Sequence, residues 1–188
     1  TMTSSDNITW SGTFTPTANK EDDGNILSLA TSYTDTAGNA GPAETTANYE
    51  VETLAPSVSS FTLSDTSLKA GDNATVTLVF SEAVASFSSS ADITVANGTL
   101  ATMSSSDNIT WSGTFTPTSN TEDASNTLSL ATSFTDTAGN AGPTATTSNY
   151  IVDDNSPSVN SFTLSDTSLK AGDNATVTLV FSEAVASF

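Results

Sequence analysis

This sequence of 188 residues contains no cysteine, histidine, arginine or glutamine. Without cysteine the chain can form neither disulfides nor thiolate metal sites. Without cysteine and histidine it also lacks most side-chain pairs that make a nucleophile and its base, and no G-x-S-x-G, P-loop or zinc pattern occurs. We therefore expect a protein that is not an enzyme.

Positive charge is nearly as scarce. Lys20, Lys69 and Lys170 stand against 21 acidic residues, and the formal net charge is -18. Nucleic acids and anionic membrane surfaces are bound by clusters of Lys or Arg, so neither is an expected partner. No run of 18 apolar residues occurs, so direct membrane insertion is not expected either. The acidity favours cations, above all calcium, which takes carboxylate and carbonyl oxygens as ligands.

Serine and threonine are abundant, at 66 of the 188 residues, while apolar residues make up 36%. Phe, Val, Leu and Trp recur at regular places, and their number suffices to bury a core. We therefore expect folded domains and not a disordered chain.

The sequence repeats itself with a period of 101 residues. Met2 falls on Met103 and Phe61 on Phe162, and 71 of the 87 comparable positions are identical without a gap. Residues 60–87 recur unchanged at 161–188. This period is far above that of solenoid repeats, so each unit is expected to be a separate domain in a tandem array.

Proline and acidic residues mark the boundaries between the units. Pro56 and Pro157 each follow a short acidic run, at 50–52 and 153–155, as is typical of a linker between domains. One complete repeat is therefore predicted at 55–155. Residues 1–54 supply the C-terminal part of one repeat, and residues 156–188 supply the N-terminal part of the next.

Within the complete repeat, short β-branched and aromatic runs are separated by Gly, Asn, Asp and Ser clusters at the spacing of a β-sandwich. In 74–81, Val76, Leu78 and Phe80 alternate with residues expected to face outward, which gives the strand one apolar face. No helix is predicted. Seven strands are expected, at 57–64, 74–81, 91–96, 99–104, 108–117, 127–134 and 145–152.

Several segments together resemble a known family: LSDTSLKAGDNATVTLVFSEAV, ITWSGTFTP, FTDTAGNAG, and a closing strand followed by an acidic linker. The whole chain resembles the bacterial Ig-like repeats that form the extender regions of giant biofilm-associated and RTX-type adhesins. The resemblance implies an all-β fold of tandem Ig-like seven-stranded β-sandwich domains joined end to end, with calcium stiffening the junctions. It also implies a secreted, extracellular protein of the bacterial cell surface that serves cell adhesion and biofilm formation.

Ig strand order would gather acidic residues at each junction, because alternate loops share a pole with the incoming linker. Like charges about 5 Å apart repel by roughly 3 kcal/mol at an effective dielectric of about 20, so such clusters need a cation or must stay apart. We expect calcium at these sites, and the alternative is separately solvated turn residues. The expected ligands are Glu50, Glu52, Glu82, Asp136 and Asn140 at the first junction, and Asp153, Asp154 and Glu183 with Asn155 at the second.

Other candidate sites have simpler explanations. A second acidic patch, at 21–23 and 122–123, lies at the opposite pole of its repeat; a solvated loop is expected there, although the patch could join the next junction. Trp10 and Trp111 are expected in the core and not as sugar platforms, because a Phe four residues further on faces the same way. Lys69 and Lys170 lie in a predicted turn, which argues against an isopeptide bond.

Three functions remain open. An extender would gain roughly 35 to 45 Å of reach per domain and would contact neighbouring repeats of the same polypeptide. A self-assembling filament would use other copies of the same protein, with strands of one chain completing the partial repeats of another. A module that binds glycan or ice through its threonine arrays is the third.

Overall fold

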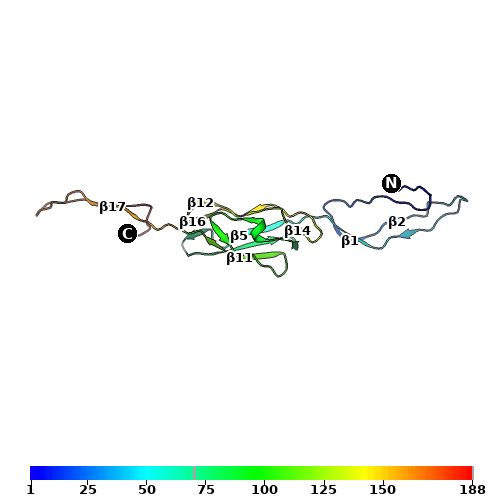
Figure 1. The fold of residues 1–188 in the computed structure, drawn as a ribbon, viewed down its shortest axis with the longest axis horizontal. Coiled ribbons are helices and arrows are strands. Elements are labelled where there is room, and N and C mark those ends of the chain that lie inside the picture. The colour runs from blue at the N-terminus through cyan, green and yellow to red at the C-terminus, as the bar shows by residue number, and fades with distance from the viewer. Residues whose placement is uncertain (70, 188) are drawn as a thin grey trace.

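The computed structural model describes residues 1–69 and 71–187. Three parts follow one another in a row: an N-terminal segment (residues 1–54), a middle repeat (residues 55–155) and a C-terminal hairpin (residues 156–187) (Figure 1). In the described residues, no helix is long and apolar enough to cross a membrane. The molecule is therefore an elongated rod with one complete domain at its centre.

A four-stranded antiparallel sheet forms one layer of the middle repeat. Its order is β10–β11–β7–β5, with bounds β5 (Val58–Leu63), β7 (Ala74–Phe80), β10 (Gly98–Leu100) and β11 (Thr110–Pro117). Alternate residues of β7 are buried, namely Ala74, Val76, Leu78 and Phe80. The period of two in the sequence therefore places one face of this sheet on the core, as predicted.

Shorter ladders form the opposite layer. Antiparallel pairs join β9 (Ile93–Thr94), β13 (Ser129–Leu130) and β15 (Ala145–Thr146), and join β8 (Val84–Ala85) to β14 (Thr135–Asp136). β16 (Tyr150–Asp153) pairs antiparallel with β12 (Glu122–Asn126) and parallel with β6 (Ser67–Lys69). Aromatic rings connect the layers, with Phe115 and Tyr150 5.2 Å apart between centroids. The predicted all-β Ig-like sandwich is confirmed.

Local hydrogen bonding changes several predicted strands. β5, β7 and β11 lie where the alternation placed them, but the strands predicted at 91–96 and 127–134 shrink to two residues each. β6, β8, β12 and β14 were not predicted. β6 exists because it pairs with β16, more than 80 positions away in the sequence, so Lys69 lies in a strand and not in a turn.

The prediction of no helix is wrong at one place. Residues Ser89–Asp92 form a four-residue α-helix, α1. The Asp92 carboxylate accepts the backbone N–H of Ser88 at 2.7 Å and the hydroxyl of Ser133, while the Ser89 hydroxyl accepts the N–H of Met103 at 2.9 Å. Polar side chains thus satisfy the backbone of one turn where a strand had been expected.

The two end parts repeat pairings of the middle repeat. The N-terminal segment contains β1 (Glu21–Asn25), β2 (Ser28–Leu29), β3 (Glu44–Thr45) and β4 (Tyr49–Glu52), while the C-terminal hairpin consists of β17 (Val159–Leu164) and β18 (Val177–Phe181). The β1–β4 pairs match those of β12–β16, and β17–β18 match those of β5–β7. Near-identical sequences therefore fold the same way locally even without the opposite layer.

Candidate metal site at the junction between repeats

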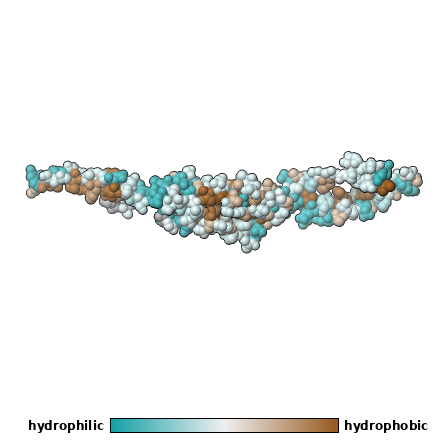
Figure 2. Space-filling model, in the orientation of Figure 1, coloured by the Kyte–Doolittle hydropathy of each residue, from teal (hydrophilic) through white to brown (hydrophobic). Residues whose placement is uncertain are grey.

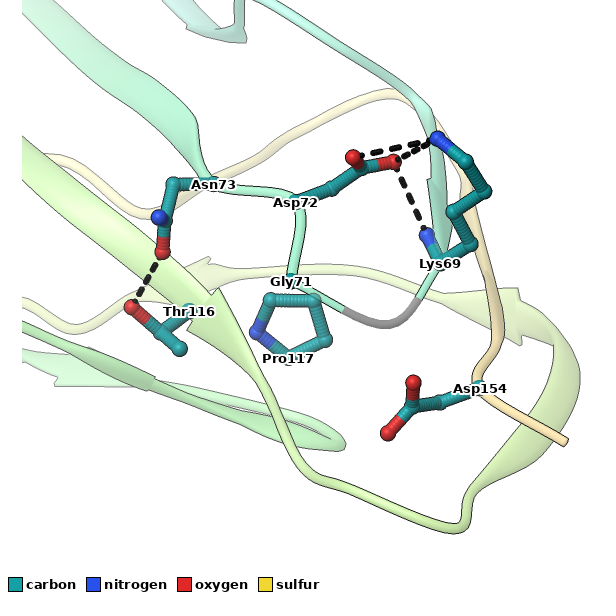
Figure 3. Close-up of a pocket in the computed structure, with 7 residues that line it drawn as sticks. All are labelled: Lys69, Gly71, Asp72, Asn73, Thr116, Pro117 and Asp154. Atoms are coloured by element: carbon teal, nitrogen blue, oxygen red, sulfur yellow. Dashed lines mark hydrogen bonds and ion pairs between the residues drawn. The ribbon is translucent and has the colours of Figure 1, made fainter.

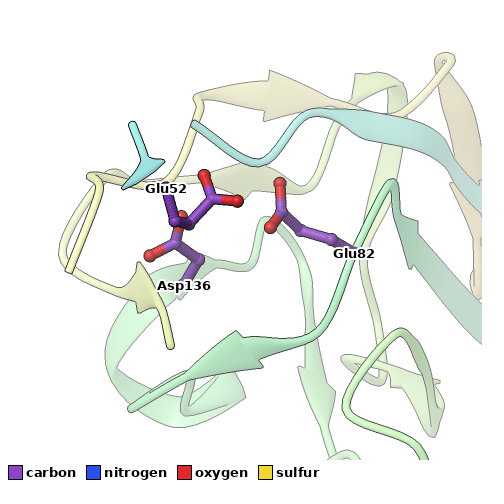
Figure 4. A group of neighbouring side chains, drawn as sticks. All are labelled: Glu52, Glu82 and Asp136. Carbon is purple, nitrogen blue, oxygen red and sulfur yellow. The ribbon is translucent and has the colours of Figure 1, made fainter. Parts of the chain in front are cut away.

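Three carboxylates meet where the N-terminal segment joins the middle repeat. Glu52 is the last residue of β4, Glu82 lies in the turn after β7, and Asp136 is the last residue of β14. One oxygen from each lies within 4.8 Å of the others. Figure 4 shows the three side chains pointing toward one another from separate elements.

Strand pairing explains how the cluster forms. In the β8–β14 ladder Asp136 lies opposite Val84, two residues after Glu82, so both carboxylates come to the same edge of the domain. The incoming chain is tied to that edge, because the Asn140 side-chain amide donates to the Leu54 carbonyl at 3.3 Å. Glu52, two residues before Leu54, is thereby held next to the other two acids.

The Asp136 carboxylate organises the loop that follows it. One oxygen accepts the backbone N–H groups of Ala138 and Asn140, both at 2.9 Å, and the other accepts the Asn140 amide at 2.8 Å. Burial of this side chain raises its pKa, but the hydrogen bonds outweigh burial and the net pKa is lowered. Asp136 is therefore a fixed negative charge at the junction.

Glu82 has the opposite behaviour. Burial raises the pKa of its carboxyl, and the nearby carboxylates of Asp136, Glu52 and Glu21 raise it further. Within the described residues the ion pair found is Lys69 with Asp72, so the Lys20 ammonium does not neutralise the cluster. The site holds more negative charge than its own side chains balance.

The remaining ligands predicted for the first junction play different parts. Glu50 is exposed and lies outside the three-carboxylate cluster. Asn140 is placed beside the cluster, where its amide group holds Asp136 and the linker. The linker and the two loops thus converge as expected, and Glu52, Glu82 and Asp136 form the centre.

At the second junction, the predicted residues line one hollow. Asp153, Asp154, Asn155 and Glu183 border a space of about 500 Å³ together with Lys69. Asp153 lies opposite Lys69 in the parallel β16–β6 ladder. The corresponding carboxylates are therefore gathered, but with a lysine among them.

Asp154 also borders a smaller hollow of about 90 Å³ (Figure 3). One of its carboxylate oxygens accepts the backbone N–H of Asn120 at 3.0 Å, and the other is buried with no hydrogen-bond partner among the described residues. Lys69 instead holds Asp72 at 3.0 Å, with its own side chain 74% exposed. An exposed lysine paired with an aspartate does not have the buried setting that an isopeptide bond needs.

Sequence reasoning underrated Glu21 as a site residue. It faces Glu52 directly in the β1–β4 ladder, and Glu122 faces Asp153 in the same way. The acidic patch expected to be a solvated loop is therefore a strand that lies beside the outgoing linker. The repeat of Glu-Asp 101 residues apart, before each closing strand, was the available signal.

Trp111 packs on the core as predicted, with its ring 4.9 Å from that of Phe87 between centroids. Trp10, its counterpart in the N-terminal segment, is exposed because the opposite strands are absent there. Neither residue forms a sugar platform in the intact domain.

Comparison with known proteins identifies the repeat. The family model of the bacterial Ig-like domain matches residues 1–51 and 52–152, which together cover most of the chain. No curated protein and no solved structure matches. Domains of this type are non-enzymatic structural modules and are typically extracellular or at the cell surface. The two matched segments adjoin at Glu52, the residue that the N-terminal segment contributes to the carboxylate cluster.

Proposed function

The chain belongs to the bacterial Ig-like domain family, and from this premise we propose that it is a stalk segment of a large bacterial surface adhesin. Calcium bound at the junctions limits bending between successive repeats. The observation that carries the proposal is the convergence of Glu52 with Glu82 and Asp136 within 4.8 Å. A cation held there would link one repeat to the next.

The donor set fits calcium. All three side chains offer oxygen, and calcium accepts six to eight oxygen ligands in a flexible geometry, whereas magnesium requires a near-ideal octahedron. One Glu52 oxygen accepts the N–H of Leu54 at 2.8 Å, which fixes this side chain on the linker side of the cluster. Glu82 contributes the group with the raised pKa, so it gains most from a nearby cation.

Near-identical repeats support the stalk. Since 71 of 87 compared positions are identical, successive domains offer almost the same surface, and the number of domains then sets the reach. The resemblance to biofilm-associated adhesins adds the setting, which is a secreted protein that extends from a bacterial cell and supports adhesion and biofilm formation. The net charge of -18 suits a calcium-rich exterior.

Calcium binding is tested by titration calorimetry on the whole chain. We expect Glu82→Gln to weaken calcium binding by at least about 10-fold, because it removes a charged ligand from the cluster. The matched control is Glu44→Gln, an exposed glutamate in β3 whose charge does not act on Glu82. Equal affinity in both variants would place calcium elsewhere.

The mechanical role is tested by small-angle scattering and thermal unfolding in EGTA and in millimolar calcium, at a concentration where the chain is monomeric. We expect a longer, stiffer particle in calcium. Calcium at about 100 times its dissociation constant should also stabilise the folded junction by about 2.7 kcal/mol. If neither the shape nor the melting temperature changes, the acidic junction is a solvated hinge and the proposal is wrong.

A further inference from the structure

The N-terminal segment exposes an apolar face whose counterpart in the middle repeat is buried. Phe14 is 53% exposed, while Phe115 at the same place in the middle repeat is fully buried. Residues 9–16 form no ladder beyond a bridge between Thr3 and Ser11, although the matching β11 pairs with β7 over its length. Other large apolar side chains of this segment that are exposed are Met2, Ile8, Trp10, Ile26, Leu27, Leu29 and Tyr33.

The C-terminal hairpin exposes the complementary face. Phe162 of β17 is 71% exposed, and its counterpart Phe61 of β5 is 6% exposed. β17 and β18 nevertheless pair in the same register as β5 and β7, including the same irregularity near the start. An isolated two-stranded hairpin is marginal in water. Figure 2 shows apolar surface along this hairpin and in patches on the N-terminal segment.

The middle repeat shows how these two faces fit together. Its core cluster has 16 residues, and every one except Ile93 has a counterpart 101 positions away in the two end parts. The counterparts are identical except for Tyr33 in place of Phe134, and one of them, Phe188, lies outside the described residues. The two ends together carry nearly a complete second core.

We infer that the apolar face of residues 1–54 binds the hairpin of residues 156–188 from a second copy of this chain. By the register of β7 and β11, Trp10 would lie opposite Leu179, and Thr13 opposite Thr176. The main-chain ladder would give strength, and the alternate apolar side chains would give specificity.

A second copy fits better than the chain's own hairpin. The N-terminal segment and the C-terminal hairpin lie at opposite ends of the rod, with the middle repeat between them (Figure 1). The contact joins two different surfaces, and a head-to-tail contact of this kind that does not close on itself yields an open filament. Each added copy would then contribute one complete repeat and one shared repeat.

The shared repeat would lack residues 88–101. It would have no counterpart of α1, β9 or β10, so its main sheet would have three strands in place of four. Tyr49, the counterpart of Tyr150, would also lack the carbonyl that Ala96 offers to the Tyr150 hydroxyl. The shared repeat is thus expected to be less stable than the middle repeat, and the association to be reversible.

The test is sedimentation velocity of the whole chain over a range of concentrations, in about 0.15 M salt to screen the negative charge. We expect a series of species at multiples of 19.1 kDa. Leu179→Asp should weaken the association by at least about 100-fold, since Leu78 at the same place is fully buried. Thr176→Asp adds the same charge at an outward-facing place and should leave the association unchanged.

Cross-linking tests the register. The chain has no cysteine, so a variant with Thr13→Cys and Thr176→Cys carries only the introduced thiols. Thr114 and Thr75, which these positions match, face each other and are exposed. Oxidation should join copies through a disulfide in this variant and not in the control with Thr9→Cys and Thr176→Cys, whose positions are out of register.

Three results would overturn the inference. The first is a chain that stays monomeric up to about 1 mM. The second is an association that Leu179→Asp and Thr176→Asp affect equally, or cross-linking that is as efficient out of register, because other surfaces would then be in contact. The third is growth that stops at two copies, which contradicts an open head-to-tail order.

Discussion

Two glycines in the loop after β14 are required for different reasons. Gly139 has a φ of +94°, with open space around the position of a Cβ atom. Gly142 has an ordinary backbone conformation, but a Cβ there would lie 2.3 Å from a ring carbon of Phe134. One glycine serves the backbone and the other serves the close approach of a buried ring.

Substitution by alanine should separate these roles. Gly139→Ala should cost about 1 kcal/mol of unfolding free energy through backbone strain alone. Gly142→Ala should cost about 3 kcal/mol, because the Phe134 ring must leave its place in a packed core. Urea unfolding of the whole chain, followed by tryptophan fluorescence, measures both. Equal losses would show that the Phe134 ring moves freely.

Tyr150 should make the fold sensitive to alkali. Burial, with the nearby Asp123 carboxylate, raises the pKa of its hydroxyl from 10.0 to about 12. The unfolded chain therefore loses this proton first, so the stabilising contribution is complete below pH 10.0 and is lost as the pH rises toward 12. Chemical unfolding at a series of pH values from 8 to 12 measures this loss.

The control for this titration is Tyr150→Phe. It removes the hydrogen bond to the Ala96 carbonyl and should lower stability near pH 7 by about 1 kcal/mol. Its stability should then depend less on pH than that of the unchanged chain between pH 10 and 12. An equally steep loss in the variant would assign the alkaline effect to other groups.

At the scale of elements, the junction joins the end of β4 to the edge made by β8 and β14, and Glu82 is the group at which charge accumulates. Its pKa is raised above the ordinary 4.5. Its contribution to stability is therefore complete below pH 4.5 and is lost as the pH rises through the folded-state pKa. In calcium-free buffer, mild acidification toward pH 4.5 should stabilise the junction.

Differential scanning calorimetry in EGTA, from pH 7 down to 4.5, tests this prediction. The gain should vanish in Glu82→Gln, which carries no charge to lose, and in saturating calcium, which requires the carboxylate. Further acidification should reverse the gain, because the pKa of Asp136 is lowered and its contribution is lost as the pH falls through that value. A gain of the same size in Glu82→Gln would contradict the assignment to Glu82.

At the scale of the whole molecule, stability should be unevenly distributed. The middle repeat holds the buried core, while the apolar residues of the two end parts are largely exposed. In dilute solution, hydrogen exchange should be slowest in β7 and β11 and fast in β17, β18 and residues 9–16. Association at high concentration should slow exchange in the end parts. Slow exchange there in the dilute monomer would mean that the ends are stable alone.

The reach of the sequence is clearest in particular residues. Alternation placed β5, β7 and β11 and the inward faces of Val76, Leu78 and Phe80, because the period of a strand is a local property. The convergence of Glu52, Glu82 and Asp136 also followed, since Ig strand order fixes which loops share a pole. β6 and α1 did not follow, because a distant strand and buried side-chain hydrogen bonds create them.

The sequence by itself determined the all-β class, the repeat of 101 residues and the acidic linkers, because periodicity, self-similarity and charge are read directly from residue order. Only the tertiary structure decided which acids share a site. The β1–β4 ladder brings Glu21 opposite Glu52, while Glu50 remains outside the cluster. Pairing between strands distant in the chain sets those distances, and such pairing depends on how the whole domain packs.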